Sequence, residues 1–222
     1  MALRKHRYIV VEGPIGAGKT TLARLLAEHA GAGLLLENPD DNPFLGSFYS
    51  DRRRWALATQ LFFLFQRVNQ LTGLKQMDLF ERPTVADFLF EKDPLFAQIN
   101  LMDEELALYQ RIYAHLAPQV PTPDLVIYLR ASVPTLLRRI SSRGREYEQT
   151  IAPEYLHSLN TLYEEWIDNF TLCPMLSVPA DDLDYVAHPG HLRLIVSKIE
   201  QKLTGKDEVV FEPEEVARAT ED

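Results

Sequence analysis

The chain has 222 residues, of which 46% are hydrophobic, and its formal net charge at pH 7 is −9. This length suits one α/β domain with a sizeable core, whereas two complete domains would be crowded. The acidic balance argues against a nucleic-acid track, which needs a basic face. The single cysteine, Cys173, excludes a disulfide framework and a cysteine-based zinc site. It suits a reducing cytosol, and its simplest interpretation is a small buried side chain.

Short apolar segments alternate with long helical patterns, which is the signature of βαβ units and a parallel sheet. The expected strands are Tyr8–Val11, Leu34–Leu36, Thr84–Ala86, Leu125–Leu129 and Met175–Val178. The expected helices are about Lys19–His29, Trp55–Thr72, Asp103–Leu116, Val133–Ser142, Pro153–Asn169 and His191–Leu203. No apolar run approaches the roughly 20 residues of a transmembrane helix. The basic N-terminus is followed by too short an apolar stretch for a signal peptide. We therefore expect a cytoplasmic protein without a membrane segment.

The domain organisation follows from the same pattern. We expect a single domain over residues 1–204, with a small lid at about 140–150. Residues 205–222 are acidic and mostly polar, so we expect a disordered tail. The helix expected over residues 55–72 is rich in Phe and Leu almost all round. Such a helix is normally part of a core, although a partner subunit could cover an additional face.

A phosphate-binding motif follows the first predicted strand. The pattern G-x-x-x-x-G-K-T is formed by Gly13, Pro14, Ile15, Gly16, Ala17, Gly18, Lys19 and Thr20, and Thr21 continues into the predicted helix. The backbone N–H groups of such a loop and the helix N-terminus bind phosphate oxygens. Lys19 would reach the β- and γ-phosphates, and the Thr20 hydroxyl would hold Mg²⁺. A chance glycine-rich turn explains neither the strand before the motif nor the helix after it. We expect residues 13–21 to bind a nucleoside triphosphate.

Two carboxylates follow neighbouring strands. Glu37 ends the second predicted strand and Asp87 ends the third. Ligands of open parallel sheets bind at the carboxyl ends of the strands, so both side chains are expected to face the phosphate loop. One carboxylate could accept a hydroxyl proton while Asp87 and Thr20 help to hold Mg²⁺, as phosphoryl transfer requires. The alternative is that each acid caps a loop or the next helix.

Arginines gather in one short stretch of this acidic chain. Arg138, Arg139, Arg143 and Arg145 lie within eight positions, and Gly144 can end the helix that carries the first three. Arg139 and Arg143 are four apart and share a helix face. A lid that closes over a transferred phosphoryl group would use such cations. The alternative is a solvated basic helix end, which the helix dipole favours.

With these features in place, the chain resembles the deoxyribonucleoside kinase family, and most of all its short bacterial members, over roughly residues 7–203. The resemblance implies a P-loop kinase fold, with a five-stranded parallel sheet flanked by helices. It also implies an ATP donor with Mg²⁺, transfer of the γ-phosphoryl group to a deoxynucleoside 5′-hydroxyl, and a homodimer. No nucleic-acid or membrane partner is implied.

The resemblance also assigns roles to individual residues. It makes Glu37 the general base, and it places Tyr49 and Glu148 at the sugar 3′-hydroxyl. The residues that it places at the nucleobase are Gln60, Arg67, Asp93 and the stacking Phe96. It makes Arg139, Arg143 and Arg145 the lid cations.

The chain departs from the family at two positions. Most members end the third strand with Asp/Glu-Arg-Ser. Here Glu81-Arg82-Pro83 precedes the apolar strand, so we align on Asp87, which also places Asp93 at the family spacing. Phe88 then occupies the arginine position, and either a lid arginine supplies the missing charge or catalysis is weaker. The second departure is Phe63, a bulky residue where relatives often have a small one.

We therefore expect a deoxynucleoside 5′-kinase. The Arg67–Asp93 pair resembles the members that accept purines or cytosine, and we favour deoxyadenosine or deoxyguanosine over deoxycytidine. One alternative is a nucleoside monophosphate kinase such as thymidylate kinase, but Phe88 removes the cation that its acceptor needs. A non-catalytic nucleotide-binding homologue is the other alternative, and the intact phosphate loop and Glu37 argue against it.

Overall fold

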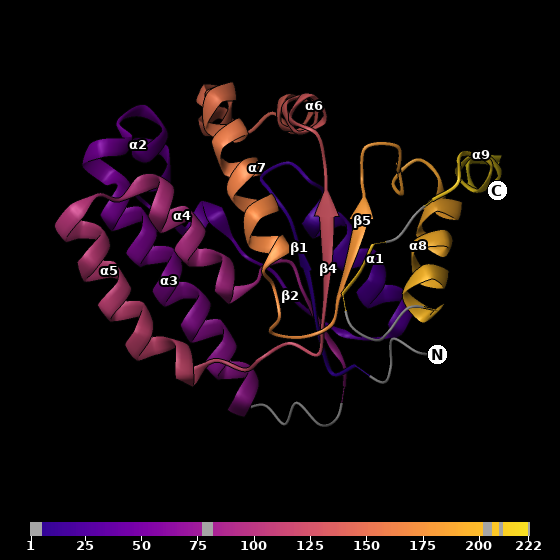
Figure 1. The fold of residues 1–222 in the computed structure, drawn as a ribbon, viewed down its shortest axis with the longest axis horizontal. Helices are drawn as coiled ribbons and strands as arrows, with labels where there is room; N and C mark the ends of the chain where they lie inside the picture. Colours follow the sequence, from indigo (N-terminus) through magenta and orange to yellow (C-terminus); the bar gives the residue numbers. More distant parts are fainter. Residues whose placement is uncertain (1–5, 77–81, 202–205, 209–210, 222) are drawn as a thin grey trace.

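A single parallel sheet organises the computed structural model, which describes residues 6–76, 82–201, 206–208 and 211–221. The strand order is β2-β3-β1-β4-β5-β6, and every described pairing is parallel (Figure 1). The strands are β1 (Tyr8–Glu12), β2 (Gly33–Leu35), β3 (Thr84–Ala86), β4 (Leu125–Arg130), β5 (Met175–Pro179) and β6 (Lys206–Glu208). All the predicted strands are confirmed, with ends that differ by a single residue at most. The α/β class is confirmed as well.

The helices connect these strands. They are α1 (Lys19–Ala30), α2 (Leu45–Ser50), α3 (Arg52–Gln76), α4 (Asp93–Asn100), α5 (Asp103–Leu116), α6 (Val133–Arg143), α7 (Pro153–Asp168), α8 (Pro189–Gln201) and α9 (Pro213–Glu221). Short 3-10 turns lie at η2 (Pro39–Asp41), η3 (Phe90–Lys92), η4 (Ala117–Gln119) and η5 (Glu146–Thr150). The six predicted helices are present, and α3 extends beyond the predicted 55–72 at both ends. The predicted end of the last one, Leu203, lies outside the described residues. Among the described residues, no helix is both long and apolar enough to cross a membrane.

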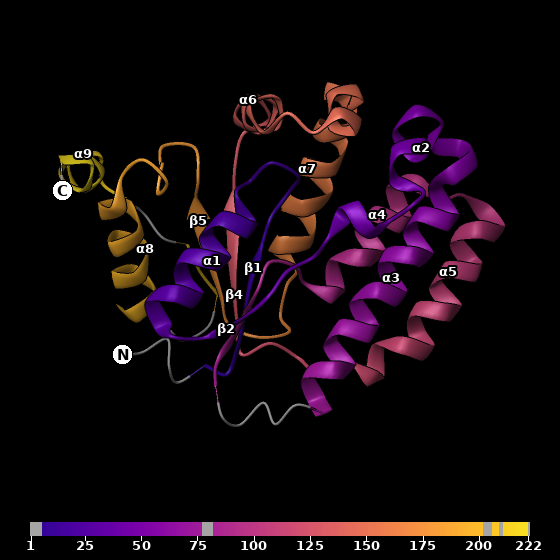
Figure 2. The same cartoon turned by 180° about the vertical axis from the view of Figure 1, so that it is seen from behind.

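The sheet is buried on both faces, as the uninterrupted apolar strands predicted. Side chains alternate along a strand, so Tyr8 and Val10 of β1 join one core while Ile9 and Val11 join the other. Residues of α3, α4, α5 and α7 complete the first core, and residues of α1 and α8 complete the second. Figure 1, and Figure 2 from behind, show α3, α4, α5 and α7 on one side of the sheet and α1 and α8 on the other. The two layers leave the carboxyl ends of the strands as the place for polar groups.

The acidic tail departs from the prediction of disorder. In its described part, β6 pairs with β5 and α9 packs against α8. A Cβ atom on Gly190 would lie 2.0 Å from the carbonyl oxygen of Ala219, so the glycine permits the close approach of the two helices. Lys198 Nζ lies 2.9 Å from Glu215 Oε2 across the same contact. The composition of the tail is polar, but one face of α9 carries Val216 and Ala219, which pack on the core around α8.

Candidate active site

The phosphate loop connects β1 to α1 in the predicted way. Gly16 and Gly18 have φ angles of 87° and 100°, which side-chain-bearing residues rarely adopt. A Cβ atom on Gly18 would lie 2.3 Å from the Tyr185 hydroxyl, which donates a hydrogen bond to the Gly18 carbonyl oxygen over 3.2 Å. Gly18 caps α1 without a side-chain hydrogen bond. The first N–H groups of α1 therefore point toward the position of an anion.

Lys19 folds back onto the loop that carries it. Its Nζ donates hydrogen bonds to the carbonyl oxygens of Gly13 and Pro14, over 2.8 and 3.1 Å. Burial lowers the pKa of the Lys19 ammonium, and the charge of Lys92 adds to this effect. The resulting pKa is about 8, although nearby carboxylates act to raise it. A bound anion beside Nζ would therefore raise the pKa of Lys19.

Arg139 does not join the other lid arginines in the pocket. Its Nη1 donates to the carbonyl oxygen of Ala17, and its Nη2 donates to those of Ala180 and Leu183. These donors bind the main chain of the phosphate loop and of the segment after β5. The structure therefore places Arg139 against the main chain of the loop and not in the cavity, whereas Arg143 and Arg145 line the cavity. Its expected role over the phosphoryl group stays a prediction.

Asp87 ties three elements together at the carboxyl edge of the sheet. It follows β3 directly, and its Oδ2 accepts a hydrogen bond from the Thr20 hydroxyl over 2.5 Å. Its Oδ1 accepts one from the Glu37 backbone N–H over 2.7 Å. Burial raises the pKa of this carboxyl, and the two donors partly offset that rise. Asp87 therefore aligns the start of α1 with the residue that follows β2.

Glu37 lies between two cations. Arg67 approaches its Oε1 through Nε at 2.7 Å and Nη2 at 2.5 Å, while Lys92 Nζ lies 3.6 Å from its Oε2. Burial acts to raise the pKa of the Glu37 carboxyl, but Arg67 and Lys92 outweigh it and lower that pKa to about 2. Glu37 is therefore ionised throughout the neutral range, with Oε1 hydrogen-bonded to Arg67 and Oε2 facing the Lys92 ammonium.

Arg67 also bridges to the predicted nucleobase residues. Its Nη1 lies 2.7 Å from Asp93 Oδ2, and the Asp93 side chain is fully buried. The Gln60 amide donates hydrogen bonds to the carbonyl oxygen and to Oδ1 of the same aspartate. The Arg67 guanidinium stacks over the Phe63 ring, 5.1 Å from its centroid. The structure thus brings the predicted donor and acceptor groups together on α3 and α4.

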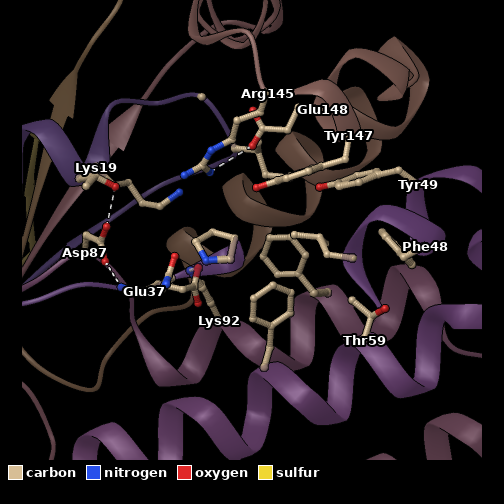
Figure 3. Close-up of a pocket in the computed structure, with 18 of the residues that line it drawn as sticks. Lys19, Glu37, Phe48, Tyr49, Thr59, Asp87, Lys92, Arg145, Tyr147 and Glu148 are labelled. Carbon is tan, nitrogen blue, oxygen red and sulfur yellow. Dashed lines mark hydrogen bonds and ion pairs between the residues drawn. The ribbon is translucent and has the colours of Figure 1, made fainter. Parts of the chain in front are cut away.

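These residues surround a cavity of about 440 Å³. Figure 3 shows Lys19 and Arg145 reaching the end of the cavity where Glu37 and Asp87 lie. Residues predicted from the sequence that line the cavity are Ile15, Gly16, Lys19, Thr20, Glu37, Tyr49, Gln60, Arg67, Asp87, Phe96, Arg143, Arg145 and Glu148. Phe63 also lines the cavity, and its bulky side chain narrows the end that lies beside α3. The cavity therefore has a charged end beside the phosphate loop and an aromatic end between the helices.

The lid is fastened by polar contacts. Arg143 donates to Glu148 Oε2 from Nε and Nη2, over 2.9 and 2.6 Å, and Arg145 Nη1 lies 3.5 Å from Glu148 Oε1. The Tyr147 ring stacks on Tyr49 at a centroid distance of 6.0 Å (Figure 3). The Tyr147 hydroxyl donates a hydrogen bond to Asp40 over 2.6 Å. The lid thereby covers the cavity and holds both of its arginines beside Glu148.

The sheet shows where the third strand ends, which decides between Glu81 and Asp87 as the strand-end acid. Residues 84–86 form β3, and Asp87 follows it. Phe88 is fully buried in the core, Arg82 is exposed, and Glu81 lies outside the described residues. The structure therefore places the strand end where we aligned it, and it places no charge at position 88.

Sequence reasoning missed several residues of the site. Lys92 lines the cavity from a charged triplet, Glu91-Lys92-Asp93, that is flanked by apolar residues. Glu12 ends the apolar strand β1 and accepts hydrogen bonds from the Gly13 and Leu89 N–H groups and from Tyr163. A charged residue next to an apolar run is a usable signal, because buried charges are almost always paired. Tyr147 and Asp40 carried no such signal, since loop residues of these types are usually solvated.

A magnesium ion would find oxygen ligands beside the phosphate loop. Within the described ranges, no group of three or more His, Cys, Asp or Glu side chains could hold a metal alone. The Thr20 hydroxyl and the Asp87 carboxylate are in contact, however. Mg²⁺ is commonly held by one or two protein oxygens together with waters and substrate phosphates. This donor pair fits such an ion.

The lowered pKa of Lys19 predicts proton uptake when a nucleoside triphosphate binds. Negative charge beside Nζ would raise a pKa that is about 8 in the free protein. Binding should then take up little proton at pH 7, about half a proton at pH 8 and close to one at pH 9. Calorimetry in buffers of different ionisation enthalpy measures this uptake.

The matched control is Lys19→Arg, because arginine stays protonated over this range. This variant should bind without the pH-dependent uptake. Uptake that is flat from pH 7 to 9 in the native chain, or unchanged in the variant, would contradict the role of Lys19.

Comparison with known proteins places this geometry in a family. The family model described as "Deoxynucleoside kinase" matches residues 9–204. A deoxyguanosine kinase of Bacillus subtilis is 36% identical over 199 residues, which cover 87% of this chain and 96% of the relative. A deoxyadenosine kinase of Lactobacillus acidophilus is 32% identical over 209 residues, covering 88% and 95%. The solved structure of a deoxyadenosine kinase from M. mycoides with bound dCTP has a TM-score of 0.76 at 28% identity, covering 87% of this chain and 99% of that one. With a P-loop kinase fold shared across this length, the chain belongs to the deoxynucleoside kinase family and is a kinase, as the sequence predicted.

Proposed function

We propose that this kinase transfers the γ-phosphoryl group of ATP to the 5′-hydroxyl of a purine deoxynucleoside. The observation that carries the proposal is the position of Glu37. An ionised carboxylate at the end of β2 shares one cavity with Lys19 of the phosphate loop and with the lid arginines. A proton acceptor opposite a triphosphate site is what transfer to a hydroxyl needs.

The proposed transfer forms one bond to the γ-phosphorus and breaks another. The acceptor 5′-oxygen forms a bond to the γ-phosphorus while the bond from that phosphorus to the β,γ-bridging oxygen breaks, which leaves ADP. The 5′-hydroxyl proton passes to Glu37. Lys19, Arg143 and Arg145 would stabilise the charge on the transferred group. Mg²⁺ held by Thr20 and Asp87 would neutralise charge on the β- and γ-phosphates.

The aromatic end of the cavity would take the nucleoside. Tyr49 and Glu148 line this part and would bind the sugar 3′-hydroxyl, and Phe96 would stack on the base. Arg67 offers donors of the kind that pair with guanine O6 and N7, and the Gln60 amide suits adenine N6 and N7. The curated relatives named above are a deoxyguanosine kinase and a deoxyadenosine kinase, and this supports a purine over deoxycytidine.

We also propose that the kinase is a cytoplasmic homodimer. Phe65 on α3 and Leu108 on α5 are nearly half exposed on helices that pack side by side. A second copy of the chain would cover these apolar side chains. Sedimentation should show a dimer that Phe65→Glu/Leu108→Glu converts to a monomer. Val186→Glu, at a more exposed apolar residue, should leave the mass unchanged, and a monomeric native chain would refute the proposal.

A substrate panel tests the proposed reaction. ADP release with ATP and Mg²⁺ should be fastest with deoxyadenosine or deoxyguanosine, slower with deoxycytidine, and slowest with thymidine. Nucleoside monophosphates should give no ADP, because they would bring a phosphate to a position where Phe88 supplies no cation. Turnover with thymidylate alone would replace the proposal by a monophosphate kinase, and no turnover with any nucleoside would sink it.

The role of Glu37 predicts a separation between catalysis and donor binding. Glu37→Gln should lower kcat by about 10²-fold or more, since a general base contributes on that scale. The Kd for ATP should change by less than about threefold, because the amide keeps the shape of the side chain. Glu28→Gln, on the exposed face of α1, is the matched control and should leave both constants unchanged. An equal loss of ATP affinity in Glu37→Gln would show that Glu37 serves the donor site.

A further inference from the structure

Among the described residues, few cations stand close enough to Glu37 to act on its carboxylate. Phe88, the residue after Asp87, is fully buried in the core and brings no charge to Glu37. The lid arginines are engaged elsewhere in the structure. Arg143 and Arg145 are held by Glu148, and Arg145 also lies 3.6 Å from Asp40. Arg67 binds Oε1 of Glu37, so a cation beside Oε2 has to come from elsewhere in the chain.

Lys92 supplies that cation from the turn after β3. Its side chain is 3% exposed, and Nζ lies 3.6 Å from both Glu37 Oε2 and Glu12 Oε2. Figure 3 shows Lys92 and Glu37 in the same part of the cavity. Glu12 is itself completely buried and bound to the N–H groups of Gly13 and Leu89. The buried Glu12 carboxylate attracts the Lys92 ammonium. Lys92 is therefore held between Glu12, which precedes the phosphate loop, and Glu37.

We infer that Lys92 is a positioning residue that holds Glu37 ionised and oriented for phosphoryl transfer. The inference rests on the proposed function of Glu37 as the proton acceptor. The ammonium is close enough for strong attraction but too far for a hydrogen bond. Lys92 therefore fixes Oε2 without occupying its lone pairs. Arg67 occupies Oε1 from the opposite side, which leaves Oε2 as the oxygen that can accept the proton.

The other charges around Glu37 do not perform this task. Lys19 donates to the carbonyl oxygens of its own loop and would turn to the triphosphate. Asp87 faces the Glu37 backbone, and the Asp93 carboxylate is paired with Arg67. Arg67 would also contact the nucleobase, so its hold on Glu37 depends on the ligand. Lys92 is instead held between two carboxylates of the fold, Glu12 and Glu37.

A double-mutant cycle tests whether Lys92 acts through Glu37. The four proteins are the native chain, Lys92→Gln, Glu37→Gln and the double variant, each measured for kcat and KM. Lys92→Gln should lower kcat by about 10-fold or more in the native background and by less than about twofold in the Glu37→Gln background. The KM for ATP should stay within about threefold. The matched control is Lys198→Gln, which removes the α8 lysine from its ion pair with Glu215 of α9. This variant should retain full activity.

A merely structural lysine would give a different result. Equal fold-losses in the two backgrounds, or an unchanged kcat in folded Lys92→Gln, would overturn the inference. Should Lys92→Gln fail to fold because Glu12 loses its partner, the same cycle is run in a Glu12→Gln background, where the buried charges are removed together. The criteria stay the same.

Urea unfolding of the same four proteins measures the coupling without turnover. Lys92→Gln should lower the unfolding midpoint more when Glu37 is present than when it is Gln. If no nucleoside is phosphorylated by the native chain, the proposed function fails, whereas the unfolding cycle still decides whether Lys92 and Glu37 are coupled. Additive midpoint shifts would overturn the inference on their own.

Discussion

The structure of the site depends on one constraint, which is that buried charges must be paired where strands end. The carboxylates Glu12, Glu37, Asp87 and Asp93 and the cations Lys19, Arg67 and Lys92 meet at the carboxyl edge of the sheet. A buried charge without a partner costs several kcal/mol, so each member limits where the others can lie. The group therefore fixes β1, β2 and β3 relative to α1 and α3. It also prepares an ionised carboxylate opposite the phosphate loop.

The lid is held by contacts of another kind. Asp40 is exposed, and its contacts with Arg145 and Tyr147 lie at the surface. Breaking one partner of a buried pair costs about 3–5 kcal/mol, whereas an exposed pair contributes about 0–1 kcal/mol. The acceptor side of the cavity is therefore rigid, while the contacts of Asp40 with the lid can break at small cost. This division suits an enzyme that must admit two substrates and exclude water between them.

The fold was largely readable from the sequence because its strands are apolar runs buried on both faces. The phosphate motif between β1 and α1 then located the carboxyl edge. Elements that depend on packing were missed. The six-residue α2 and the eight-residue α4 are too short for a clear periodicity. The tail helix α9 owes its place to Gly190 and to the apolar face that α8 offers it.

The sequence by itself located the phosphate loop and the two strand-end carboxylates, because the motif and the ends of the apolar strands place these groups, whereas the Gln60, Arg67 and Asp93 set was implied by the family resemblance. The tertiary structure decided which cations serve which anions. Arg139 is bound to main-chain carbonyls of the phosphate loop and of the segment after β5. Lys92 lies beside Glu37, where the apolar Phe88 offers no charge. Side-chain pairing between β1, β2 and the turn after β3 depends on distances through space. No local pattern along the chain contains those distances.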